Sequence, residues 1–199
     1  MQSGIYDLHA PLLLGGEHSE AEVFGAAVWL WMHSPQHRDL PLHALPTVLL
    51  PIIKHQHYLL VSREGRPVFF MSWMSLDNEA ERRYLSQPAI MVQKSDWLSG
   101  DRLWIRDWIA PFGDTRAISR LVTDLLFPDR CFRSLYHQGK RRGMRVMNFK
   151  GRQISPQQAR AWRAGTPLSV DIAEFPPAKS LRRAEHPKTA QADITTLKD

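Results

Sequence analysis

The sequence predicts a single α+β domain in which helices flank a central, mostly antiparallel sheet. A length of 199 residues suits one domain. The chain is 43% hydrophobic and 23% charged, which is ordinary for a folded globular protein. Helical and strand-like hydrophobic spacings are mixed along the chain in an order that favours hairpins. The longest apolar stretch, residues 24–32, is too short for a transmembrane helix of roughly 20 residues.

The first expected element is a buried helix. Residues 1–18 contain proline and glycine without a sustained period, so we expect them to be a flexible lead-in. Ser19 and Glu22 form a capping-box pattern, which starts a helix that is apolar on most sides and ends near residue 32. A second helix is expected over residues 46–54, kinked or limited by Pro51.

Strand signals begin after this second helix. A turn at residues 63–66 joins two strand-like runs into a hairpin, and the second run, apolar on both faces, should be central in the sheet. The remaining expected elements are a charged helix at 78–85, a strand at 102–109, an amphipathic helix at 117–127, strands near 132–136 and 145–149, and a helix near 156–164. We therefore expect a folded domain over residues 19–170 and a disordered tail over 171–199.

Charge and cysteine content limit the classes of partner. Lys and Arg number 26 against 20 Asp and Glu, and the net charge of +6 favours an acidic partner, whether nucleic acid, anionic lipid or protein. One basic run, usually a solvated hairpin face, comprises Lys140, Arg141, Arg142, Arg145, Lys150 and Arg152. The single cysteine, Cys131, excludes an intramolecular disulfide and is read as structural. With no secretory signal pattern, we expect a cytoplasmic protein.

Asp107 breaks the apolar pattern of its expected strand. Strict alternation places it on one face with aliphatic residues, namely Leu103, Ile105 and Ile109. The opposite face would then carry Trp104, Arg106 and Trp108. A buried carboxylate needs a cation or a hydrogen-bond donor, or else its pKa rises. A structural ion pair with an arginine and a functional role are both consistent with this pattern.

The turn after the first helix holds His33, Ser34 and His37 between prolines. Loops fixed on rigid apolar elements commonly carry catalytic groups, although a given histidine is more often a surface residue. A metal pair of His33 and His37 is disfavoured, because Pro35 interrupts helical spacing and no acidic third ligand is near in sequence. A hydrolase triad of Ser34, His37 and Asp107 is conceivable, but Ser34 is not in a G-x-S-x-G elbow.

Several ordered blocks between residues 24 and 155 resemble the RTX toxin-activating lysine acyltransferases. The blocks are residues 29–39 (WLWMHSPQHRD), 56–60 (QHYLL), Pro67 with Ser72-Trp73, 99–104 (SGDRLW) and 107–113 (DWIAPFG). Members of this family are cytoplasmic bacterial enzymes of GNAT-like fold. They transfer a fatty acyl group from acyl carrier protein to internal lysines of an RTX protoxin and thereby activate it. The resemblance implies the same fold and activity here.

The resemblance also assigns roles to residues. It implies a catalytic histidine at His37, a catalytic aspartate at Asp107 and a contributing serine at Ser34. A protoxin lysine is protonated at cytoplasmic pH, so a base such as His37 is needed to free the amine, and Asp107 can orient the imidazole. Acyl carrier protein and the protoxin are the implied partners, with no metal, bound cofactor, nucleic acid or stable membrane insertion. A homodimer and a transient acyl-enzyme are left open.

Two functions from other classes compete with this reading. One is a non-catalytic GNAT-like escort of an RTX protein, against which the presence of both His37 and Asp107 argues. The other is a basic nucleic-acid-binding domain, which is favoured by the net charge alone.

Overall fold

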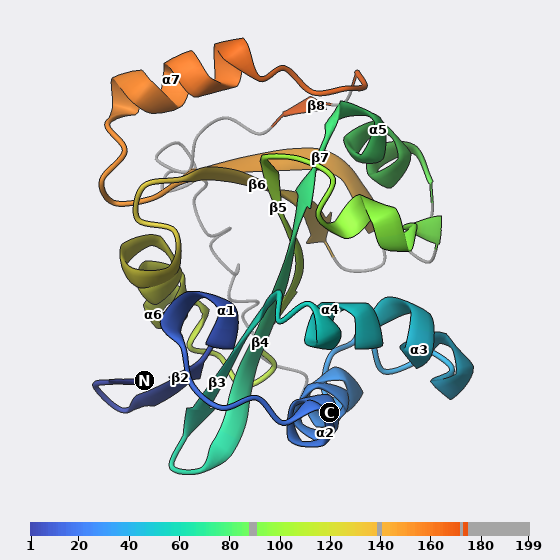
Figure 1. Cartoon of the computed structure of the whole chain (residues 1–199), viewed down its shortest axis with the longest axis vertical. Coiled ribbons are helices and arrows are strands. Elements are labelled where there is room, and N and C mark those ends of the chain that lie inside the picture. The colour runs from blue at the N-terminus through green and yellow to red at the C-terminus, as the bar shows by residue number, and fades with distance from the viewer. Residues whose placement is uncertain (88–90, 139–140, 172, 175–199) are drawn as a thin grey trace, which may run out of the picture.

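Within the part of the chain that the structure describes, eight strands form one sheet whose spatial order follows the order of the chain (Figure 1). The structure is a computed structural model and describes residues 1–87, 91–138, 141–171 and 173–174. The strands are β1 (Gln2–Ser3), β2 (Tyr6–His9), β3 (Tyr58–Arg63), β4 (Arg66–Leu76), β5 (Arg102–Ile109), β6 (Cys131–Gln138), β7 (Arg141–Lys150) and β8 (Ala173–Glu174). Helices flank this sheet, so the expected α+β domain with a central, mostly antiparallel sheet is confirmed.

Two strand pairs depart from the antiparallel pattern. The β5–β6 and β7–β8 pairs are parallel, whereas the other neighbouring strands are antiparallel. Pairing of β5 with β6 is restricted to Trp104 opposite Arg133 and Ile105 opposite Ser134. A parallel pair requires a crossover connection, and the chain makes it through α6 (Thr115–Leu121) and the π-helical turn Val122–Leu126. The β5–β6 ladder thus ends at Ile105.

Four helices cover one face of the sheet, which we call the α2 face. They are α2 (Glu20–Met32), α3 (Leu45–Val48), α4 (Leu50–Lys54) and α5 (Asn78–Ser86), with the short 3-10 turns Leu42–Ala44 and Lys94–Trp97 beside them. Ser19 caps α2 by accepting from the Glu22 N–H, as the sequence predicts. The expected second helix is divided at Leu49 into α3 and α4, with Pro51 in the first turn of α4.

The other face, which we call the α6 face, is covered by α1 (Pro11–Leu14), α6 and its π-helical turn. Side chains of β4 alternate between the two faces, as a central strand requires. Phe70 and Met74 pack into the core of the α2 face, whereas Phe69 and Met71 pack into the core of the α6 face. Both halves of the core therefore meet at β4, and the predicted central position of this strand is confirmed.

The structure differs from the sequence-based expectation at the N-terminus. Residues 1–18 were expected to be a flexible lead-in, but β2 pairs with β3 over its whole length and Leu8 is 2% exposed. Tyr58 on β3 holds the segment further, because its hydroxyl lies 2.9 Å from both Nε2 of His9 and Nδ1 of His18. The strand is short, so its alternation gave only a weak periodic signal.

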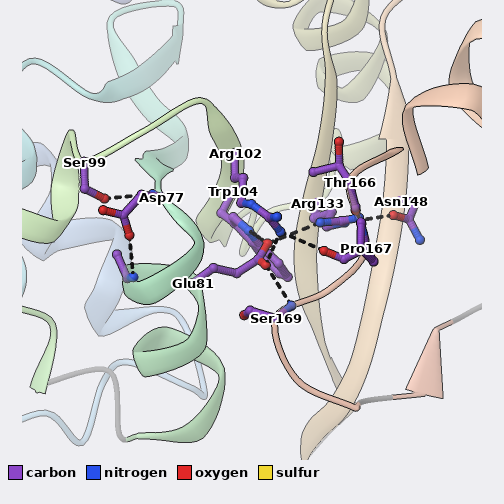
Figure 2. A network of polar contacts seen from close by, with 11 residues as sticks. Asp77, Glu81, Ser99, Arg102, Trp104, Arg133, Asn148, Thr166, Pro167 and Ser169 are labelled. Carbon is purple, nitrogen blue, oxygen red and sulfur yellow. Dashed lines mark hydrogen bonds and ion pairs between the residues drawn. The ribbon is translucent and has the colours of Figure 1, made fainter. Parts of the chain in front are cut away.

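The buried carboxylate of Glu81 is the centre of a polar network that holds residues 166–169 against the sheet (Figure 2). Glu81 on α5 is 0% exposed and accepts from Arg102, from the Trp104 indole and from Arg133. It also accepts from the backbone N–H of Ser169 at 3.0 Å. The two arginines in turn donate to the carbonyl oxygens of Pro167 and Thr166. Residues 166–169, which follow α7 (Pro156–Gly165), are thereby attached to the sheet.

Most of the predicted disordered tail, residues 171–199, lies outside the described residues. Asp171 and β8 are the described part, and β8 pairs with Arg145 and Val146 of β7. Among the helices that the structure describes, none combines the length and apolar character needed to span a bilayer.

Candidate active site

A tight turn after α2 brings Ser34 and His37 together. The N–H of Ser34 donates to the Trp31 carbonyl at 2.9 Å, and the N–H of His37 donates to the Ser34 carbonyl at 3.0 Å. The N–H of Leu40 then donates to the His37 carbonyl at 2.9 Å. These bonds fold the chain back on itself at the helix end, and Oγ of Ser34 lies 2.8 Å from Nδ1 of His37. The polar turn identified in the sequence is therefore rigidly built.

A β-bulge in β5 reverses the sheet face to which its last side chains point. The sequence-based prediction for this strand is therefore wrong. Ser72 of β4 lies opposite Asp107, but the next residue, Trp73, lies opposite Ile105, so the register skips Arg106. Beyond the bulge the alternation is reversed. Ile109 joins Trp104 in the core of the α2 face, whereas Leu103 and Ile105 pack in the core of the α6 face.

Asp107 consequently faces α2 rather than the aliphatic row predicted for it. Its Oδ1 lies 3.4 Å from Nε2 of His37. Its Oδ2 accepts from the hydroxyl of Ser72 and from Nη1 of Arg106, the latter at 3.2 Å. Burial opposes ionisation of this carboxyl, but the Arg106 charge and the hydrogen bonds from His37 and Ser72 outweigh it and hold its pKa well below the usual range. Asp107 is therefore a carboxylate.

The imidazole of His37 is held between these groups in one orientation. Its ring centroid lies 4.9 Å from that of the buried Trp31, and its side chain is 17% exposed. An ionised Asp107 can only accept, so Nε2 of His37 carries the proton that faces it. In the neutral ring Nδ1 is then the acceptor, and it accepts from the Ser34 hydroxyl. The site thus holds a base whose unprotonated nitrogen, Nδ1, accepts from the Ser34 hydroxyl.

His33 lies in a different environment from His37. Its ring packs against those of Trp29 and Phe112, at centroid distances of 4.7 and 5.1 Å. Trp29 and Phe112 are themselves 5.4 Å apart and partly exposed. The two histidines therefore do not converge. Over the residues that the structure describes, no group of three or more His, Cys, Asp or Glu is arranged to hold a metal ion.

The loop after β5 carries a carboxylate at its end. Asp114 adopts a left-handed conformation, with φ of 65°, and its Oδ2 lies 2.8 Å from Nη1 of Arg63 on β3. The N–H of Gly113 donates to the Ala110 carbonyl at 3.3 Å, and Pro111 has no N–H. This loop therefore places an acidic residue at the start of α6, and the carboxylate pairs with Arg63 rather than capping the helix.

The other sequence candidates that the structure describes have surroundings of their own. Cys131 is buried at the start of β6, and burial raises the pKa of its thiol, consistent with a structural residue. Of the basic run, Lys140 lies outside the described residues, as do the side chains of Arg141 and Arg142. Arg152 pairs with Asp124 at 3.0 Å. The exposed side chains of Lys150 and Arg145 are on β7.

Sequence reasoning assigned no role to Ser72 and Arg106, which both contact Asp107. Ser72 had a usable signal, because its hydroxyl interrupts the otherwise apolar run of residues 68–74. Arg106 had none, since strict alternation places it on the face opposite to Asp107, and only the bulge brings the two side chains together.

Comparison with known proteins identifies the family. The family model of the RTX toxin acyltransferase family matches residues 17–150. The RTX-I toxin-activating lysine-acyltransferase ApxIC of Actinobacillus pleuropneumoniae is 41% identical over 138 residues, covering 69% of this chain and 79% of that protein.

Two further relatives show the same relationship. The protein-lysine myristoyltransferase HlyC of Escherichia coli is 39% identical over 138 residues, covering 69% of this chain and 80% of HlyC. The protein-lysine palmitoyltransferase CyaC of Bordetella bronchiseptica is 38% identical over 154 residues, covering 76% of this chain and 82% of CyaC. Residues 17–150, which the family model matches, include Ser34, His37, Ser72 and Asp107. On these matches the chain belongs to the RTX toxin acyltransferase family.

Proposed function

We propose that this acyltransferase moves a fatty acyl group from the thioester of an acyl carrier protein to internal lysine side chains of an RTX protoxin and so activates the toxin. The observation that carries the proposal is the position of His37, with Nδ1 at Ser34 and Nε2 at Asp107. Such a base is what lysine acylation requires. The relatives are named as lysine acyltransferases for myristoyl and palmitoyl groups, which supports a long saturated acyl chain here.

In the proposed reaction His37 takes a proton from the substrate amine. A lysine with an ordinary pKa near 10.4 first loses one proton to solvent, and the neutral amine attacks the thioester carbon. As the C–N bond forms, the amine proton passes to Nδ1 of His37. The C–S bond then breaks, and the imidazolium returns that proton to the departing pantetheine thiolate. Asp107 stabilises the imidazolium through Nε2.

We further propose that the acyl group is transferred directly, with Ser34 relaying the proton to Nδ1. An acyl-serine would need donors for the oxyanion, and in α/β-hydrolases the N–H of the residue after the serine is one of them. Here that residue is Pro35, which has no N–H, and the N–H of Ser34 is already bound to the Trp31 carbonyl. These features support Ser34 as a relay rather than a nucleophile.

A carrier protein rather than coenzyme A is the proposed donor. Enzymes that bind the coenzyme A pyrophosphate do so with free backbone N–H groups at a glycine-rich helix start. The corresponding loop here ends in Asp114, which is paired with Arg63, and contains Pro111. A net charge of +6 suits an acidic carrier protein. The bacterial cytoplasm, where such carriers are loaded, is the proposed site of action. Acyl-acyl carrier protein acts there as a co-substrate, and no cofactor is proposed. A homodimer is left as an alternative to the monomer.

The test is acylation of an RTX protein substrate, measured by intact mass with and without the enzyme. With acyl carrier protein thioester as donor, we expect mass increments equal to one fatty acyl group per modified lysine. The same acyl chain on coenzyme A should support little transfer, and the carrier-protein reaction should slow as salt rises. An unchanged toxin mass would favour a non-catalytic escort. Salt-insensitive transfer from acyl-coenzyme A alone would overturn the carrier-protein proposal.

A further inference from the structure

Arg106 is buried, and its guanidinium contacts three groups that come from different elements of the fold. Its side chain is 6% exposed, and Nη1 donates to the carbonyl of Val48, at the end of α3, at 2.7 Å. Its guanidinium carbon lies 5.2 Å from the ring centroid of Trp97, a cation–π contact. The same Nη1 lies 3.2 Å from Oδ2 of Asp107. The guanidinium is thus fixed by a helix end, an aromatic ring and the carboxylate.

The contacts of Asp107 are divided between its two oxygens. Oδ2 is held by Arg106 and by the fully buried Ser72, whereas Oδ1 faces His37. A carboxylate bound at one oxygen by two donors cannot rotate freely, so Oδ1 stays directed at the imidazole. Only the bulge allows this arrangement, because consecutive residues of a regular strand point to opposite faces.

We propose that Arg106 is a positioning residue for acyl transfer: through Asp107 it fixes the proton of His37 on Nε2 and leaves Nδ1 free as the base. The proposal rests on the function proposed above. The Arg106 charge also favours the ionised form of Asp107, against the effect of burial. Without that cation the His37–Asp107 pair would bind a proton more tightly, and the base would be blocked to a higher pH.

The charged and titratable surroundings of the pair come from several elements. Ser72 on β4 donates to Asp107. Tyr84 on α5 interacts electrostatically with both Arg106 and Asp107, and burial raises the pKa of its phenol, so it stays neutral. The Val48 carbonyl and the Trp97 ring complete the surroundings of Arg106. Arg106 is therefore the cation that these contacts place beside Asp107.

Arg102 offers a matched control on the same strand. It is also a largely buried arginine in an ion pair, but its partner is Glu81 in the network that holds residues 166–169. Replacing Arg102 by Met removes a buried cation from β5 without touching His37 or Asp107. A purely structural role of Arg106 would make Arg106→Met resemble Arg102→Met.

The experiment compares the parent with R106M, R106K and R102M, using acyl carrier protein thioester and the RTX protein. R106M should lower kcat by about 10- to 100-fold with little change in KM, since the buried Arg106 would act through Asp107 rather than on substrate. The acid limb of its kcat/KM profile should move roughly one unit to higher pH. R106K, which keeps the cation, should recover part of both effects. R102M should keep the kcat of the parent and the acid limb of its kcat/KM profile, although its melting temperature should be lower.

A second measurement does not depend on activity. Long-range 1H–15N spectra of histidine-labelled protein report which ring nitrogen of His37 carries the proton, with H37A identifying the signal. The parent should show the Nε2–H form, and R106M or the milder R106K a mixture. Parental tautomer and pH limb in both Arg106 variants would overturn the proposal. Absence of any transfer by the parent, with the tautomer shift still seen, would instead contradict the proposed function.

Discussion

Oγ of Ser34 lies 2.8 Å from Nδ1 of His37, three residues further along the same turn. This short sequence distance means that the two groups depend on one local backbone geometry, which is fixed by the N–H of His37 donating to the Ser34 carbonyl. Asp107, by contrast, reaches the same imidazole from seventy residues away. Substitutions in the turn and in β5 therefore test different parts of the site.

His37→Ala should abolish acyl transfer and leave the fold nearly intact. The imidazole belongs to neither hydrophobic core, and Asp107 keeps Ser72 and Arg106 as partners, so loss of the imidazole should cost little stability. Removal of a general base, by contrast, costs about 10²- to 10⁴-fold in rate. His33→Ala is the matched control and should retain most activity, because the His33 ring packs against Trp29 and Phe112 rather than against Ser34 or Asp107. Rates and thermal melts of the two variants check this. Equal losses of activity would remove His37 as the base.

Ser34→Ala should reduce turnover by about 10- to 100-fold without eliminating it, since water can replace a relaying hydroxyl. Single-turnover mass spectrometry of the enzyme should detect no acyl adduct in parent or variant. A parental adduct that disappears in Ser34→Ala, together with complete loss of transfer, would establish an acyl-serine and contradict direct transfer.

Asp107→Asn should lower kcat by about 10²- to 10⁴-fold with little change in KM. The amide keeps the shape of the side chain but has only one oxygen. With that oxygen toward Arg106 and Ser72, its NH₂ would face Nε2 of His37 and favour the wrong tautomer. Steady-state kinetics and urea unfolding separate a catalytic role of Asp107 from a structural one. A variant that unfolds easily yet turns over normally when folded would make Asp107 purely structural.

Truncation after Val170 should be nearly silent, because the contacts of residues 166–169 with Arg102, Arg133 and Glu81 are kept. Truncation after Gly165 removes those contacts and leaves buried charges short of partners, which should cost about 1–3 kcal/mol or more in unfolding free energy. Urea unfolding measures the difference. If the protein truncated after Val170 folds but no longer transfers acyl groups, the removed tail takes part in substrate docking.

Stability should fall as the pH drops below about 6.5, because the native state keeps His57 neutral. Burial lowers the pKa of His57 to about 4, so between these values only the unfolded chain binds this proton. The free energy of unfolding should then decrease by up to about 1.4 kcal/mol per pH unit. His57→Gln should flatten this slope, and exposed His33→Gln should not. Equal slopes at pH 5–7 in urea titrations would contradict the prediction.

The hydrophobic periods of the sequence were sufficient to predict most elements. Helix α2 with its Ser19 cap, the β3–β4 hairpin and the buried β4 follow from residues whose neighbours in sequence decide their conformation. Strands β1 and β2 were missed because Tyr6 and Leu8 gain their burial from β3, more than fifty residues away. Long-range pairing of so short a strand leaves little local signal.

The candidate site was predictable in its residues but not in its geometry. His37, Ser34 and Asp107 stood out as polar groups in a proline-bounded turn and an apolar strand, and the family resemblance gave them roles. Their convergence required the bulge at Arg106, which reverses the alternation after Ile105. A one-residue insertion in the register has no compositional mark, so the sequence predicted the wrong face for Asp107.

The Glu81 network also affects how the chain can fold while it is being synthesised. Glu81 is made early, but Arg133 follows 52 residues later and the Ser169 N–H follows 88 residues later. Until those residues leave the ribosome, closing α5 onto the sheet would bury a carboxylate without its full set of donors, which is unfavourable. Nascent chains that stop short of residue 169 should therefore remain open at this corner and accessible to chaperones. Completion of this corner of the domain is thus coupled to synthesis of the chain as far as residue 169.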